Sequence, residues 1–421
     1  TSSFVSLSEA IMKGLPDDNG LFMPEYFPKL SEQFINNLKD YTFQEIAFEV
    51  TRTLFQGFIP ENDLKKIIND SINFPAPIQS LDKQTHILEL FHGPSLAFKD
   101  FGARFMAKIM SYFNRGNNKE LVILVATSGD TGGAVASGFL KAKGIKVVIL
   151  YPKGKVSMLQ EKQLTTLGHN ISALEVDGTF DDCQTLVKQA FLDKELNNQI
   201  RLTSANSINI ARLIPQSFYY FEAFKQLNDY YNPITFVVPS GNYGNITAGL
   251  IAQKMGLPIS HFIAASNAND IVPHYLCTGN YNPRPSIRTL SNAMDVGNPS
   301  NFIRIQELFQ NNLTQLKASF SSFSFSDDET KEMMKDIYNK FNYISEPHGA
   351  IGYLGLKKHS LHEDEFGIFL ETAHPVKFLE VVEATLPISV EIPSQIKEVM
   401  NKEKVAIKIA NYKELKTFLN S

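Results

Sequence analysis

From about residue 120 onwards, short apolar and β-branched runs alternate with longer amphipathic segments. The runs that we expect to be strands lie at 120–126, 145–152, 171–178, 233–241, 259–266 and 365–375. Strands buried on both faces of a parallel sheet read as continuous apolar runs, because neither face meets water. Their alternation with helical segments predicts an α/β fold with two open, mainly parallel sheets and a cleft between them.

The first 80 residues have a different pattern. Apolar residues recur at helical spacing in 31–55 and 61–74, which indicates amphipathic helices. We therefore expect a mostly helical N-terminal domain over 1–80, a smaller α/β domain over 81–205 and a larger α/β domain over 206–421. Ligands of such folds bind outside the carboxyl ends of the strands, so we expect the binding site at the loops that follow strands.

Composition argues against several classes of protein. The net charge of −4 over 421 residues gives no electrostatic support for binding nucleic acid. Cys183 and Cys277 cannot form a disulfide framework, and neither they nor the nine histidines have a metal-type spacing, so we expect no metal. The apolar runs are too short to span a bilayer. The N-terminal residues lack the features of a secretion signal, and we expect a cytoplasmic protein.

The first unusual loop is ATSGDTGGAVA at 126–136. Small residues between a strand and a helix leave backbone N–H groups free at the helix N-terminus, which is a ready site for an anion. The loop lacks the G-x-G-x-x-G pattern of dinucleotide sites, and Asp130 would repel a pyrophosphate. A carboxylate held near Thr127, Ser128 and Thr131 fits better, although a tight turn that needs glycine for steric reasons is an equal alternative.

The second loop is PSGNYGNITAG at 239–249. Gly241 and Gly244 again lie between a strand and a helix, the loop has no acidic residue, and Asn242 and Asn245 add amide donors. This composition favours a phosphate monoester held by backbone N–H groups. The loop lacks the Gly-Lys-Ser/Thr of a nucleotide-binding P-loop, so Mg-ATP chemistry is disfavoured.

The third loop, TSANSINIARLIPQ at 203–216, places several polar donors in one passage: Asn206, Ser207, Asn209 and Arg212. Arginine is suited to a bidentate grip on a phosphate or carboxylate. The alternative is a helix N-cap followed by a solvated arginine, and for this loop taken alone the alternative is favoured.

Lys99 raises a separate question, because it lies in an apolar helical segment at 95–110. One interpretation is that its amine extends to solvent and pairs with Asp100 or a neighbour. The other is a reactive amine that forms a Schiff base with a carbonyl, for which pyridoxal phosphate is the commonest cofactor. Such a cofactor needs a phosphate site, which the second loop offers, and a partner for its ring nitrogen, which Thr372 could supply.

Eight segments of the sequence together resemble the threonine synthases, a family of pyridoxal-phosphate enzymes of fold type II. The segments are NGLFMP (19–24), FHGPSLAFKDFG (91–102), ATSGDTGGAVA (126–136), NSINIARLIPQ (206–216), VPSGNYGN (238–245), SNAMDVGNPSN (291–301), SEPHGAIGY (345–353) and ETAHPVKF (371–378). They occur in the family's order and cover nearly the whole chain. The long N-terminal region is similar to that of the bacterial and fungal type, and the implied fold is the tryptophan synthase β-like one.

The resemblance implies pyridoxal 5′-phosphate as the cofactor and a role for each matching residue. Lys99 would form the Schiff base and then act as the general base, and Thr372 would meet the pyridine nitrogen. Asp130 stands where many fold type II relatives carry an asparagine that faces the cofactor's phenolic oxygen. The cofactor phosphate would be held by Gly241, Asn242, Tyr243, Gly244 and Asn245. The substrate would be held by Thr127, Ser128 and Thr131 at its carboxylate, and by Lys155, Asn206, Ser207, Asn209 and Arg212 at its phosphate.

The implied substrate is O-phospho-L-homoserine, which would be converted with water to L-threonine and phosphate. Substrate and cofactor each carry a phosphate, and the second and third loops would supply the two sites. An alternative within fold type II is a threonine or serine deaminase or a cysteine synthase-like enzyme, whose substrates carry no phosphate. An alternative of another class is a non-catalytic metabolite-binding α/β protein. We expect a monomer or a homodimer.

Overall fold

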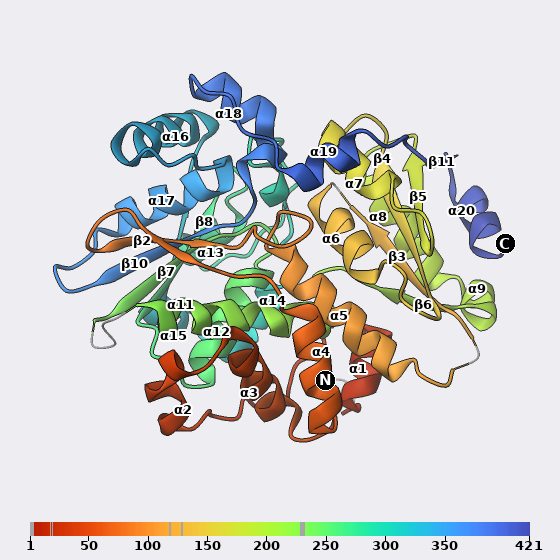
Figure 1. The fold of residues 1–421 in the computed structure, drawn as a ribbon, viewed down its shortest axis with the longest axis horizontal. Helices are drawn as coiled ribbons and strands as arrows, with labels where there is room; N and C mark the ends of the chain where they lie inside the picture. The colour runs from red at the N-terminus through yellow and green to blue at the C-terminus, as the bar shows by residue number, and fades with distance from the viewer. Residues whose placement is uncertain (1–3, 17, 19, 118, 128, 228–231) are drawn as a thin grey trace.

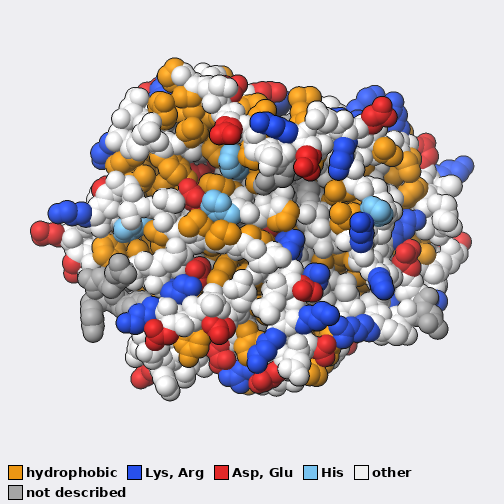
Figure 2. All heavy atoms as spheres, in the orientation of Figure 1, with side chains coloured by type: hydrophobic (Ala, Val, Ile, Leu, Met, Phe, Trp, Pro, Cys, Tyr) orange, Lys and Arg blue, Asp and Glu red, His pale blue; other side chains and the backbone are white. Residues whose placement is uncertain are grey.

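The computed structural model describes residues 4–16, 18, 20–117, 119–127, 129–227 and 232–421. Two sheets lie side by side, and the N-terminal helices pack against the lower side of both lobes in the view of Figure 1. Acidic and basic side chains are interspersed over the face shown in Figure 2. Within the described residues, no helix has the length and apolar character needed to cross a membrane.

The larger sheet has six strands in the order β1-β2-β10-β7-β8-β9. These strands are β1 (Ile78–Ser80), β2 (Thr85–Glu89), β7 (Ile234–Pro239), β8 (His261–Ser266), β9 (Phe320–Ser324) and β10 (Phe366–Glu371). Only the β1–β2 pair is antiparallel among these described strands.

The smaller sheet has five strands in the order β11-β5-β4-β3-β6, and every neighbouring pair is parallel. These strands are β3 (Leu121–Ala126), β4 (Ile145–Pro152), β5 (Ile171–Val176), β6 (Arg201–Ser204) and β11 (Ile407–Ile409). The predicted fold class is therefore confirmed, and each of the six predicted runs contains a strand.

The helices fall into three groups. Those before the first sheet are α1 (Leu7–Lys13), α2 (Glu32–Asn36), η1 (Leu38–Asp40), α3 (Phe43–Phe55) and α4 (Glu61–Ser71). Those that follow β3, β4 and β5, together with the last helix of the chain, are α6 (Asp130–Phe139), α7 (Met158–Thr165), α8 (Phe180–Leu192), α9 (Lys194–Gln199) and α20 (Tyr412–Leu419). The others are α5 (Lys99–Phe113), α10 (Ile210–Leu213), η2 (Ile214–Ser217), α11 (Phe218–Gln226), α12 (Gly244–Lys254), α13 (Ile271–Thr278), η3 (Asn292–Met294), α14 (Phe302–Leu308), α15 (Leu313–Ser319), α16 (Asp327–Phe341), α17 (Pro347–His359), η4 (Pro375–Phe378), α18 (Leu379–Thr385) and α19 (Ser394–Met400).

The strands of both sheets bury side chains on two faces. In β3, Ile123 belongs to a core that continues into the larger sheet at Phe236, whereas Leu124 belongs to a separate core under α8 and α20. In β7, Val237 packs into a third core with residues of α16 and α17. This double burial is the physical reason why the strands are continuous apolar runs.

Sheet membership divides the chain differently from the expected domain boundaries at two places. Strand β2 lies within the expected smaller domain (81–205) but pairs with β10 of the larger sheet. Strand β11 lies within the expected larger domain (206–421) but pairs with β5 of the smaller sheet. Besides the expected crossing between β6 and β7, the chain therefore crosses between the two sheets before α5 and near its C-terminus. At the second of these places α18 and α19 lead across the top of Figure 1.

Candidate functional site

Lys99 is the first residue of α5, and a short pairing fixes the segment that precedes it. The N–H of Phe98 donates to the carbonyl of Thr372 at 2.9 Å, and the N–H of His374 donates to the carbonyl of Leu96 at 3.0 Å. Leu96 has a positive φ of 59°, which is uncommon for a residue with a side chain. The pairing places Lys99 next to the residues that follow β10, as the prediction for Thr372 requires.

Lys99 is half-buried, and its amine makes no hydrogen bond or ion pair with any described residue. Burial lowers its pKa, and the charges of Arg212 and Lys377 act in the same direction, whereas Asp130 and Glu346 oppose them. Asp100 makes no ion pair with it: one Asp100 carboxylate oxygen accepts the N–H of Ser95 at 2.8 Å, and the other has no hydrogen-bond partner among the described residues. A lysine with a lowered pKa has more of the neutral amine that can attack a carbonyl.

The loop at 241–245 leads from β7 into α12. Its backbone N–H groups make no hydrogen bond to any described acceptor, so five consecutive donors are free. Gly241 is required sterically, because a Cβ there would lie 2.5 Å from the Cα of Met294. Tyr243 has a left-handed backbone with φ of 60°, which turns the loop into the helix.

The amide side chains of this loop stabilise it through hydrogen bonds to other parts of the protein. The Asn242 amide donates to Ser207 Oγ at 2.6 Å, and its oxygen accepts the N–H of Ser300 at 2.6 Å. The Asn245 amide donates to the carbonyl of Pro239 at 2.8 Å. The loop's amide side chains are therefore used within the protein, and the backbone N–H groups are the donors left for an anion.

The loop after β3 is arranged differently. Thr127 Oγ1 accepts the N–H groups of Gly129 and Gly132, both at 2.9 Å. Thr131 is half-buried at the start of α6. Ser128, predicted here as a carboxylate contact, lies outside the described residues.

Asp130 is the first residue of α6 and is buried. Its Oδ1 is 2.9 Å from the ammonium of Lys377 and accepts the Gln160 amide at 3.1 Å. Burial alone would raise the pKa of Asp130, but the charges of Lys377 and Lys99 hold that pKa well below its usual range. Asp130 is therefore a carboxylate at neutral pH.

The third loop lies beside the second, because Ser207 accepts the hydrogen bond from Asn242. Asn209 is buried and its side chain is used within the protein: it accepts the N–H of Ala211 as an N-cap and donates to the carbonyl of Ile11. Asn206 and Ser207 are half-buried. Lys155 is exposed on the turn after β4, where its charge acts on Asp182.

Arg212 is buried rather than solvated, which excludes the alternative interpretation of this residue. Its Nη1 donates to the carbonyl of Ala205 at 2.6 Å, and its buried Nε has no partner among the described residues. Burial lowers its pKa to about 10, although Asp100 opposes the change. A buried guanidinium with a free donor is suited to bind an anion.

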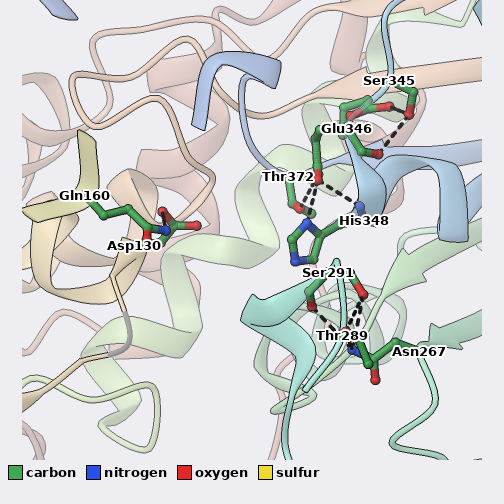
Figure 3. Close-up of polar contacts among 10 residues, drawn as sticks. Asp130, Gln160, Asn267, Thr289, Ser291, Ser345, Glu346, His348 and Thr372 are labelled. Atoms are coloured by element: carbon green, nitrogen blue, oxygen red, sulfur yellow. Dashed lines mark hydrogen bonds and ion pairs between the residues drawn. The ribbon is translucent and has the colours of Figure 1, made fainter. Parts of the chain in front are cut away.

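Thr372 belongs to a buried polar group at the carboxyl end of β10. Its hydroxyl donates to Glu346 at 3.3 Å, and the same carboxylate accepts the backbone N–H of His348 at 2.7 Å. Figure 3 shows this group on one side and Asp130 with Gln160 on the other. Beside it, burial and the charge of Glu346 raise the pKa of Glu371 well above its usual value.

Sequence reasoning missed three residues with contacts at the site. Lys377 holds Asp130, Glu346 accepts from Thr372, and buried Arg304 donates to the carbonyls of Phe22 and Ile208. Arg304 also donates to Asn301 at 2.6 Å, and Asn301 in turn donates to the carbonyl of Asn242. Lys377 and Glu346 lie in segments that carry the family resemblance, and this position was the only signal in the sequence that could have found them. Arg304 lies outside those segments.

Comparisons with known proteins agree over the whole chain. A family described as pyridoxal-phosphate dependent enzyme matches residues 76–369, and families described as threonine synthase N terminus and threonine synthase, C-terminal match residues 1–72 and 349–419. Threonine synthase of Haemophilus influenzae is 49% identical over 393 residues, which cover 93% of this chain and 91% of that protein. The chain belongs to the threonine synthase family.

Solved structures give the same result. The crystal structure of threonine synthase from Escherichia coli matches with a TM-score of 0.92 and 42% identity, covering 99% of this chain and 96% of that one. The PLP-bound threonine synthase from Brucella melitensis matches with a TM-score of 0.93 and 33% identity, again covering 99% and 96%. The chain is therefore a pyridoxal-phosphate-dependent lyase, and another fold type II activity is not favoured.

The residues present fit this cofactor. The free N–H groups at 241–245 form an anion cradle in which a side chain at position 241 would collide with Met294. Lys99 offers an unpaired amine whose pKa is lowered. Thr372 offers a buried hydroxyl, and its carbonyl accepts the N–H of Phe98, the residue before Lys99.

Proposed function

We propose that this chain converts O-phospho-L-homoserine and water to L-threonine and inorganic phosphate. The observation that supports it best is the presence of two separate features that are suited to bind an anion. One is the set of free N–H groups at 241–245, and the other is buried Arg212, whose charge acts on Lys99. The cofactor phosphate and the substrate phosphate each need one such site.

Each residue then has a defined task. Pyridoxal phosphate supplies a conjugated ring that accepts negative charge from the substrate's α-carbon. Lys99 would hold the cofactor and, once displaced by the substrate amine, would remove the α-proton and then a β-proton. The lowered pKa of Lys99 suits a general base, because more of the amine is neutral near pH 7.

Substrate recognition would use the two ends of the molecule. The backbone N–H groups of Asp130 and Thr131, together with Thr127 and Ser128, would hold the carboxylate at the N-terminus of α6. Arg212, Asn206, Ser207 and Lys155 would hold the phosphate and stabilise it as a leaving group. Asn209 would act through the loop, because its side chain already caps α10 and binds Ile11.

The test replaces Lys99 with alanine in the holoenzyme. We expect loss of both the visible absorbance of the bound cofactor and the release of phosphate and threonine from phosphohomoserine. Lys108→Ala is the control, because Lys108 lies on the same helix and is exposed in an ion pair with Asp70. Threonine formation by Lys99→Ala, or wild-type enzyme that only releases ammonia from threonine, would contradict the proposal.

Location and assembly are proposed from the sequence. We infer a cytoplasmic enzyme that works as a monomer or a homodimer, that takes a small-molecule substrate and that has no nucleic-acid partner. The net charge of −4 supports the last point.

A further inference from the structure

Lys377 carries a buried charge that the proposed reaction does not use. It lies in η4, and its side chain has an exposed fraction of 0%. Its Nζ lies 2.9 Å from each of three oxygens: the carbonyl of Ser95, Oε1 of Gln163 and Oδ1 of Asp130. An ammonium has three protons, so these contacts use all of them.

The three partners come from different parts of the fold. Ser95 lies in the segment that precedes Lys99, Asp130 begins α6 and Gln163 lies in α7, whereas Lys377 follows strand β10 of the larger sheet. Lys377 therefore joins the two lobes next to Lys99. A fully buried lysine is rare unless it is paired, and here the only carboxylate within ion-pair distance among the described residues is Asp130.

Asp130 has one oxygen committed and one free. Oδ1 takes both Lys377 and the Gln160 amide, while Oδ2 makes no hydrogen bond to a described residue. The other charged group that acts on Asp130 is Lys99. The charge of Lys377 also acts on Asp100, and the charges of Arg212 and Glu346 act on Lys99.

We propose that Lys377 is a positioning residue that holds Asp130 as a carboxylate beside the amine of Lys99. The ion pair fixes Oδ1 and leaves Oδ2 without a hydrogen-bond partner among the described residues. A carboxylate there stabilises the protonated form of Lys99, which is the form that results when the amine removes a proton from the substrate, so loss of the carboxylate should slow that step. The inference rests on the proposed role of Lys99, but it concerns the ionisation of Asp130, which can be measured separately.

The first test is Lys377→Met in the holoenzyme. Without its counterion, buried Asp130 is expected to take up a proton within the working pH range, because an unpaired buried carboxylate favours its neutral form. Turnover of phosphohomoserine should then gain an acidic limb, falling about tenfold per pH unit as for a single ionisation. Lys108→Met, which breaks an exposed ion pair with Asp70, is the matched control and should keep the wild-type profile.

The second variant identifies the ionising group. Lys377→Met combined with Asp130→Asn should lose the new acidic limb, because the group that titrates is gone. A limb that persists in the double variant would assign it to another group, such as Asp100, and would overturn the inference. A Lys377→Met profile parallel to that of the wild type would overturn it as well.

A readout independent of turnover is the pH dependence of the thermal unfolding midpoint of the holoenzyme. In Lys377→Met the folded-state pKa of Asp130 is raised, so stability should rise as pH falls through that pKa; the double variant should lack this rise. If Lys377→Met does not fold, Lys377→Gln keeps polar contacts without the charge and should show the same rise and limb. A wild type that makes no threonine would contradict the proposed function, whereas the unfolding readout would still decide this inference.

Discussion

The loops at 127–131 and 241–245 have the same place in the fold and opposite electrostatics. Each follows a buried parallel strand and begins a helix, α6 or α12. In the second loop the backbone N–H groups are free and no acidic residue is present. In the first, the Thr127 hydroxyl takes two N–H groups and Asp130 brings a negative charge that Lys377 balances. The comparison predicts that the second loop is the stronger anion site, because its own side chains leave its backbone N–H groups available.

The largest expected loss of unfolding free energy comes from a change in the first loop. Asp130→Asn removes the counterion of fully buried Lys377, and breaking such a pair costs about 3 to 5 kcal/mol of unfolding free energy. Chemical denaturation of the holoenzyme at neutral pH measures this loss. Asp70→Asn, which breaks an exposed pair with Lys108, should cost about 1 kcal/mol or less.

The stability that Asp130 contributes should depend on pH in a defined direction. The folded-state pKa of Asp130 lies below its unfolded value, so its stabilisation is present above about pH 4 and is lost as pH falls through the folded pKa. The difference between wild type and Asp130→Asn should therefore shrink as pH falls below about 4. A difference that does not shrink on acidification would contradict the ionised state of Asp130.

The second prediction concerns the free N–H groups. In Gly241→Ala the new Cβ would lie 2.5 Å from the backbone of Met294, whereas in Gly244→Ala it would lie 3.4 Å from the Asn301 amide. Gly241→Ala must therefore displace the loop. Because a hydrogen bond to a charged group contributes about 1.5 to 3 kcal/mol, we expect cofactor affinity to fall by roughly 10- to 100-fold. Titration of cofactor-free enzyme with pyridoxal phosphate measures the affinity, and equal losses in the two variants would refute the steric argument.

The two loops also show what a sequence can predict. Buried strands and glycine-rich turns are local signals, and they located both loops and six of the strands. Strand β2 was missed because Thr85, His86 and Glu89 interrupt its apolar run. Lys377 was missed because it lies far from Lys99 in the chain, and the contacts that bring the two together, such as the pairing of Leu96 and Phe98 with residues after β10, are tertiary.

The smallest loss of stability should follow removal of the Thr127 hydroxyl, which distinguishes the first loop from the second. Thr127→Val keeps the shape of the side chain but removes the oxygen that accepts the N–H groups of Gly129 and Gly132. This contact resembles a helix N-cap, whose loss costs about 1 kcal/mol, and urea denaturation measures it. Thr127→Ser keeps the oxygen and should stay close to the wild type. If the hydroxyl only braces the loop, Thr127→Val should change stability more than the KM for phosphohomoserine, whereas a large rise in KM with unchanged stability would instead place Thr127 in contact with the substrate carboxylate.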